Sequence, residues 1–190
     1  MRLLMVVTSA LSYFIVEGIS ARKYATTRRM NFEHPLTALV WVASILSILA
    51  TYVASYLLIG NLELAGKAYP ELWWKLATII TCGTLAGAVI PEVTKIFTST
   101  HSKHVREVVK ASEEGGASLN ILAGLTAGNF SAFWVGGITI GLLMAGAYAI
   151  SQLTGGGGGL AAVMPAEAIF AFGLVAFGFL GMGPVTIAVD

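Results

Sequence analysis

Charged residues are scarce in this chain. Asp, Glu, Lys and Arg make up 11% of its 190 residues, whereas 56% are hydrophobic, and the mean hydropathy is +0.81. Soluble domains carry about 25% charged residues, so this composition excludes an ordinary soluble domain. The formal net charge of +1 leaves no basic surface of the kind that binds nucleic acid. The sequence therefore predicts an integral membrane protein with no nucleic-acid partner.

Cysteine is scarcer still, because Cys82 is the only one. A single cysteine excludes both a disulfide framework and a cysteine zinc site within the chain. Glycine, in contrast, is plentiful, and much of it lies within apolar stretches. The spacing Gly-x-x-x-Gly occurs at Gly83/Gly87, Gly124/Gly128 and Gly137/Gly141. This spacing places two glycines on one helix face and allows a second helix to pack closely. It predicts architecture and not chemistry.

Five apolar stretches are long enough to cross a bilayer, which requires about 20 apolar residues per helix. We expect an all-α, polytopic transmembrane bundle of about five helices. The fourth stretch is too long for one straight span, so it should protrude or bend, with Gly136 and Gly137 as the expected place. The predicted helices cover residues 3–20, 36–60, 74–98, 117–152 and 166–190.

The first stretch could also be a signal peptide, since Arg2 precedes an apolar run. However, Ser9, Ser12 and Glu17 interrupt that run, and no clear cleavage site precedes a soluble domain. We expect a retained helix. Glu17 lies close to the following basic connection and should reach water or Arg22 there.

The connections predict the orientation, because Lys and Arg in short loops stay on the cytoplasmic side. Connections 21–35 and 99–116 together carry seven Lys or Arg residues, whereas 61–73 carries only Lys67 and 153–165 carries none. The first two should be cytoplasmic loops and the last two external loops. Within 153–165, the run Gly155–Gly159 is expected to be a flexible linker.

Charges inside the bilayer are costly and are candidates for function. Glu92 and Lys95 are three residues apart in the third predicted helix and follow Pro91. At this spacing they can form an ion pair on one face. The pair is either an inert interfacial contact or part of a functional site.

Asp190 ends the last predicted helix, in which no residue from Ile169 to Val189 is ionisable. Gly181, Gly183 and Pro184 should loosen this helix and free backbone groups that need protein or water as partners. A carboxylate at such a place could hold Mg²⁺ or position a basic partner. Alternatively, it is a helix-end carboxylate that faces water.

His101 and His104 are three residues apart in a polar segment. Two histidines at this spacing could contribute to a metal site. Because no further ligand pattern surrounds them, we expect surface histidines in a basic loop.

Residues 89–100 read VIPEVTKIFTST and residues 105–131 read VREVVKASEEGGASLNILAGLTAGNFS. These segments resemble the membrane-bound, ion-translocating inorganic pyrophosphatases, in which a helix opens with a pattern that Gly116, Asn120, Gly124 and Leu125 fit. The end of the chain, GFLGMGPVTIAVD, is similar to a family helix that runs into an Asp-x-Tyr-Gly-Pro segment. A weaker likeness extends back through NFEHPL at 31–36. The chain departs from the family at position 95, where Lys95-Ile96-Phe97 replaces a frequent Glu-Tyr-Tyr.

The resemblance implies an internal fragment of a pump with about sixteen membrane helices. The full protein would hydrolyse Mg²⁺-bound pyrophosphate at the cytoplasmic face of the cell membrane and translocate H⁺ or Na⁺, with K⁺ as a possible second cofactor and a homodimer as the assembly. By resemblance, Asp190 lies at the edge of the substrate site. The family's acidic and lysine motifs lie outside this chain, so the fragment alone should be inactive.

Two other functions remain open from the residues alone. The chain could be a small complete channel or secondary carrier with its buried charges along the path. It could also be a non-catalytic structural membrane subunit that pairs through its glycine faces.

Overall fold

The computed structural model describes residues 2–25, 33–61, 63–64, 67–153 and 160–189. Arg28, Arg29, the glycine run Gly155–Gly159 and Asp190, all singled out above, lie outside the described residues. The chain divides into two compact units. Unit 1 comprises residues 1–88 and 143–190, and unit 2 comprises residues 89–142.

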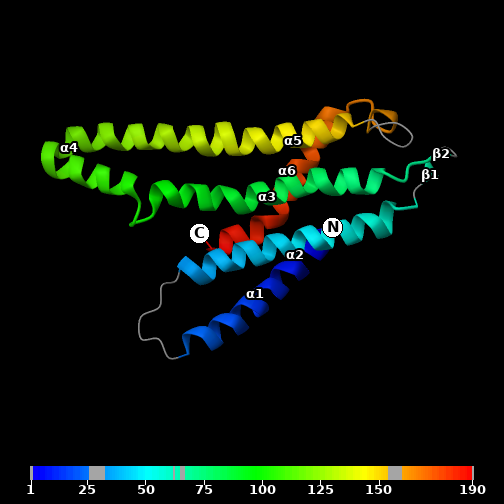
Figure 1. Cartoon of the computed structure of the whole chain (residues 1–190), viewed down its shortest axis with the longest axis horizontal. Helices are drawn as coiled ribbons and strands as arrows, with labels where there is room; N and C mark the ends of the chain where they lie inside the picture. The colour runs from blue at the N-terminus through cyan, green and yellow to red at the C-terminus, as the bar shows by residue number, and fades with distance from the viewer. Residues whose placement is uncertain (1, 26–32, 62, 65–66, 154–159, 190) are drawn as a thin grey trace. The chain divides into compact units, whose positions relative to one another are not determined.

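Helices account for nearly all of the described chain (Figure 1). Glu63 pairs with Ala68 and Leu64 with Lys67 in a two-residue antiparallel ladder, which the sequence did not predict. The elements in chain order are α1 (Arg2–Tyr24), α2 (Glu33–Ile59), β1 (Glu63–Leu64), β2 (Lys67–Ala68), α3 (Leu72–Thr98), α4 (Lys103–Ala132), the π-helix η1 (Phe133–Ile140), α5 (Gly141–Gln152), the 3₁₀-helix η2 (Leu160–Ala162) and α6 (Glu167–Val189).

Four helical stretches among the described residues are long and apolar enough to cross a membrane. Three of them are single helices, whereas the third includes α3, α4, η1 and α5. The prediction of an all-α, multi-pass bundle is confirmed, and the expected five helices differ from these four because the third stretch contains two of them. The stretches are Leu3–Tyr24, His34–Ile59, Leu72–Gln152 and Glu167–Ile187.

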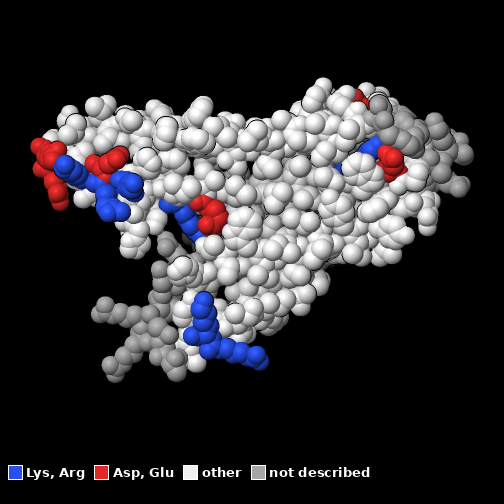
Figure 2. Space-filling model, in the orientation of Figure 1, with Lys and Arg blue, Asp and Glu red and all other residues white. Residues whose placement is uncertain are grey.

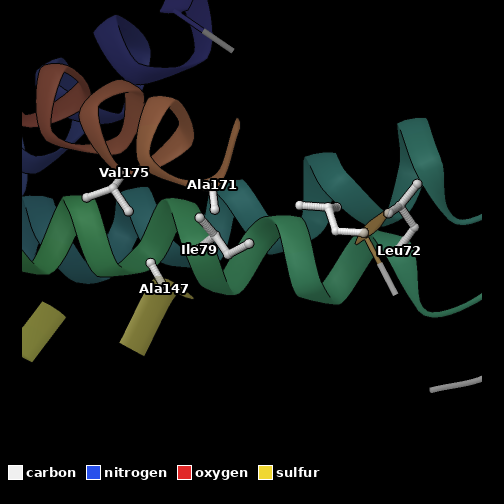
Figure 3. Packing of buried hydrophobic residues seen from close by; sticks show 6 residues of the cluster. Leu72, Ile79, Ala147, Ala171 and Val175 are labelled. Carbon is white, nitrogen blue, oxygen red and sulfur yellow. The ribbon is translucent and has the colours of Figure 1, made fainter. Parts of the chain in front are cut away.

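Unit 1 has a core of small and aliphatic side chains contributed by several helices. Val175 and Ala171 of α6 face Ile79 of α3, and Ala147 of α5 lies beside them (Figure 3). These four residues, with Leu72 and Leu160, form the first buried cluster. A second cluster combines α2, α3 and α6 through Val40, Ala43, Ala88, Met182 and Val185.

A row of hydroxyl side chains follows one face of α2. Ser44, Ser47, Thr51 and Ser55 are all buried, and the Ser47 and Thr8 hydroxyls lie 3.4 Å apart between α2 and α1. Small hydroxylated residues let membrane helices approach closely while their oxygens bond locally. The Thr51 hydroxyl, for example, donates to the Ser47 carbonyl at 2.7 Å. At Ser47 this row meets α1 through the Thr8 hydroxyl.

Unit 2 is a helical hairpin. Helix α4 breaks at Gly116, whose φ of 64° and ψ of −154° are strongly disfavoured for residues with a Cβ. The chain reverses there, as the α4 ribbon shows in Figure 1. The expected loop 99–116 is therefore helical from Lys103 onward. Ser102 begins this helix, because its side chain accepts a hydrogen bond from the His104 N–H.

The second arm of the hairpin continues into η1, which includes Gly136 and Gly137. Here the Thr139 hydroxyl donates to the Trp134 carbonyl five residues back, at 3.0 Å. Such π-helical turns are rare and widen a helix locally. The long stretch predicted at 117–152 thus changes its helical geometry at the two glycines.

Candidate functional site

Glu92 and Lys95 meet near the end of α3. Lys95 Nζ donates to Glu92 Oε1 at 2.9 Å, and the side chains are 31% and 27% exposed for Lys95 and Glu92, respectively. Pro91 lies within α3, so the Gly87 carbonyl receives no hydrogen bond from residue 91. The geometry brings the two predicted charges together. It does not by itself distinguish an inert pair from a functional one.

Lys75 is a buried charge that was not among the candidate residues predicted from the sequence. Its side chain is 3% exposed and pairs with Glu71 at 3.1 Å. Lys75 Nζ also donates to the Leu153 carbonyl at 3.0 Å, just beyond the end of α5. The lysine therefore joins the start of α3 to the end of α5 within unit 1. The four-residue spacing between Glu71 and Lys75 could have predicted their ion pair. The hydrogen bond to the Leu153 carbonyl could not be predicted, because Leu153 is distant in the sequence.

Helix α6 leads toward Asp190 and is held against α3 by glycines. A side chain at Gly178 would collide with the Ile80 carbonyl, and one at Gly83 would collide with the Val175 carbonyl. The two helix backbones can therefore meet only because both positions lack a Cβ. Further along α6, Pro184 lies inside the helix, and the Thr186 hydroxyl donates to the Met182 carbonyl at 3.1 Å.

The two histidines have separate environments in unit 2. His101 is exposed, whereas the His104 ring stacks on Phe97 with centroids 5.0 Å apart and lies 6.0 Å from Phe130. His104 Nδ1 is 3.9 Å from Glu107. His104 is thus part of an aromatic cluster that holds the base of the hairpin.

The described residues contain no cluster of metal ligands. Among them, no three His, Cys, Asp or Glu side chains come close enough to hold a metal ion. Mg²⁺ requires several oxygen ligands in octahedral geometry. The described side chains therefore offer Mg²⁺ no cluster of three such ligands.

Large apolar side chains cover the outside of the helices. Leu57 of α2 is 76% exposed and Ile187 of α6 is 81% exposed. Charged side chains leave most of the visible face free (Figure 2). Exposed aliphatic surface on helices of membrane-spanning length requires lipid or further membrane helices to cover it. The fold therefore defines a multi-pass integral membrane protein.

The chain belongs to the family of inorganic H⁺ pyrophosphatases, whose family profile matches residues 1–190. It is 56% identical over 190 residues to a K(+)-insensitive pyrophosphate-energized proton pump of Chlorobaculum tepidum. That match covers 100% of this chain and 24% of the relative. The family resemblance inferred from the sequence is thereby confirmed.

Two further relatives are more distant. A K(+)-insensitive pyrophosphate-energized proton pump of Chloroflexus aurantiacus is 30% identical over 122 residues, which cover 63% of this chain and 15% of the relative. A Clostridium tetani protein, provisionally named a K(+)-stimulated pyrophosphate-energized sodium pump, is 28% identical over 168 residues, 86% of this chain and 22% of the relative. The chain thus spans less than a quarter of each relative's length. No solved structure gives a significant match.

Proposed function

We propose that this chain is part of a cell-membrane pump that hydrolyses inorganic pyrophosphate and translocates protons. The observation that carries this proposal is the 56% identity along the whole chain to a protein named as such a pump. The membrane-spanning helices of the fold support it, because ion translocation requires them.

The choice of ion and cofactor follows the same relatives. Both proteins named as proton pumps are also named K(+)-insensitive. We therefore propose H⁺ as the pumped ion and activity without K⁺, so the K⁺ dependence that the resemblance left open is not supported. Mg²⁺ would be required with the substrate, held by ligands outside the described residues.

The test uses the full-length protein in inverted membrane vesicles. Adding pyrophosphate with Mg²⁺ should release phosphate and acidify the vesicle lumen, which a pH-sensitive dye reports. Both signals should persist without Na⁺ and without K⁺. Phosphate release that requires Na⁺ and drives Na⁺ uptake would instead make the protein a sodium pump. Absence of phosphate release and of acidification would refute the proposal. The 190-residue chain alone should release no phosphate.

We also propose on which side of the membrane each connection lies and where Asp190 is located. Connections 21–35 and 99–116 would be cytoplasmic, and 61–73 and 153–165 external, on the distribution of Lys and Arg. Asp190 would lie at the edge of the substrate site. Labelling of single cysteines introduced in each connection tests the first assignment. An Asp190→Asn substitution, which should lower phosphate release without lowering membrane insertion, tests the second.

Glu92 and Lys95 would contribute to ion movement and not to hydrolysis. Their support is an ion pair on a helix of membrane-spanning length. Glu92→Gln should lower acidification per phosphate released, whereas Glu107→Gln, at a side chain 76% exposed, should not. An unchanged ratio in the first variant would make the pair structural.

A homodimer of the full-length protein is also proposed, and light scattering in detergent tests it.

A further inference from the structure

A pocket of about 270 Å³ lies between the end of α1 and the start of α2 in unit 1. Neither the pumping reaction nor the family match assigns it a role. Its wall combines cationic, hydroxyl and apolar groups from two segments of the chain. The lining residues are Ile19, Ser20, Lys23, Tyr24, His34, Pro35 and Ala38.

The polar part of this pocket suits an anion. Lys23 and His34 bring N–H donors, while Ser20 and Tyr24 bring hydroxyls, and the described residues that line the pocket include no carboxylate. Lys23 Nζ lies 5.8 Å from the centre of the Tyr24 ring, which keeps the ammonium beside the aromatic wall. Figure 2 shows blue side chains at this end of α1. Charged and neutral N–H and O–H donors together are the groups that bind phosphate oxygens.

The position of the pocket identifies the kind of anion. The two spans that flank it are Leu3–Tyr24 and His34–Ile59, so the pocket lies where one span ends and the next begins. That level is the boundary between the hydrocarbon core and water, where phospholipid phosphates are found. The start of α2 adds the positive end of a helix dipole.

The apolar part of the wall favours a lipid over a free phosphate. Ile19 is 58% exposed, and both Ile19 and Ala38 belong to the membrane spans. A hydrated inorganic anion gains nothing from such a surface, whereas a phospholipid covers it with its glycerol and upper acyl carbons. The pocket thus has hydrogen-bond donors in one part of its wall and apolar groups in another. A phospholipid likewise has a polar phosphate and an apolar acyl chain.

We propose that this pocket binds the headgroup phosphate of an anionic phospholipid. Lys23 and His34 hold the phosphate oxygens, and Ser20 and Tyr24 provide further donors. The bound lipid joins the end of α1 to the start of α2 at the membrane surface. The basic residue Arg22 beside the pocket attracts the same anionic lipids without lining it.

The experiment reconstitutes the full-length protein in bilayers of equal phosphatidylglycerol and phosphatidylcholine and measures retained lipid by native mass spectrometry. The parent protein should retain phosphatidylglycerol preferentially. The Lys23→Gln/His34→Gln variant should lose about tenfold of that preference. The matched control, His101→Gln/Lys103→Gln, removes the same residue types from unit 2 and should retain it. Equal retention of both lipids by the parent, or an equal loss in the control, overturns the proposal.

A pocket-filling variant and a competition with soluble anions provide two further tests. Ala38→Trp fills the pocket but keeps its charges, so it should also lower phosphatidylglycerol retention. This variant decides the question if the charge variant is not recovered folded. Excess inorganic phosphate or pyrophosphate should leave the bound lipid in place. Displacement by either anion would make the pocket a soluble-anion site and overturn the lipid assignment.

Discussion

The two units of this chain both contain helices with the Gly-x-x-x-Gly spacing, but their interiors differ. Unit 1 contains two buried clusters, whereas none of the residues from 89 to 142, all of which the structure describes, is buried. The glycine pairs illustrate the difference. Gly83 and Gly87 lie against Val175 and Met182 of α6, whereas a Cβ at Gly124 or Gly128 would have no atom within 4 Å.

The Gly-x-x-x-Gly spacing thus has two roles in one chain. In unit 1 the glycines let two described helices meet, and their energetic role is visible in the contacts. In unit 2 the apolar faces around the glycines need lipid or further protein as a cover. Substitutions should therefore destabilise unit 1 through packing, and unit 2 mainly through its turn and its helix cap. This distinction can be tested in the full-length protein by substitutions in each unit.

The largest effect is expected at the contact between α3 and α6. Gly178→Leu would place a side chain on the Ile80 backbone, which cannot move aside as a flexible side chain could. We expect a loss of more than about 3 kcal/mol, seen as little folded protein and a lower thermal unfolding midpoint in detergent. Gly173→Leu, on the same helix with nothing within 4 Å, is the control. Equal behaviour of both variants would disprove the close packing.

The next largest difference in stability between the units should come from their ion pairs, because the lysine is buried in unit 1 and exposed in unit 2. Lys75→Met leaves Glu71 and the Leu153 carbonyl without their donor. The expected destabilisation is about 2 kcal/mol, below the range for fully buried pairs because Glu71 is 38% exposed. Lys110→Met, in a pair 74% and 63% exposed in unit 2, should cost less than about 1 kcal/mol. Thermal unfolding of both variants measures the contrast, and a larger loss for Lys110 would reverse it.

The turn of the unit 2 hairpin should be the most sensitive point of that unit. Gly116→Ala introduces a Cβ at φ 64° and should cost about 1–2 kcal/mol. Gly124→Ala lies in regular helix with free space and should be neutral or slightly stabilising. Thermal unfolding, together with the rate of proteolysis near residue 116, reports the difference. Similar results for the two glycines would mean that the reversal at Gly116 does not occur.

The smallest effect is expected at the start of α4. Ser102→Ala removes the acceptor for the His104 N–H and should cost about 1 kcal/mol. Ser102→Thr keeps a hydroxyl that accepts from the His104 N–H and donates to the Ile96 carbonyl, so it should retain the stability. Hydrogen exchange of the first turn of α4 is the most direct measurement. If Ser102→Ala leaves the exchange unchanged, the helix start is held by other contacts.

The membrane helices and the family could be predicted from the sequence. Membrane helices must satisfy their backbone hydrogen bonds internally, so long apolar stretches predict helices with few alternatives. The likeness at 89–100, at 105–131 and at the C-terminal segment predicted the family, which the match over residues 1–190 confirms. Asp190 stays a prediction, since it lies outside the described residues. The functional role of Glu92 and Lys95 also stays a prediction, although their ion pair is present.

The sequence by itself determined the membrane class, the helical content and the family, because hydropathy and local motifs depend on residues close in the chain. Only the tertiary structure decided which glycines touch another helix, that Lys75 reaches the Leu153 carbonyl, and that α4 reverses at Gly116. These features join residues far apart in sequence or depend on one backbone conformation. Neither hydropathy nor residue spacing contains that information, since both are the same for a glycine that is packed and for one that is open.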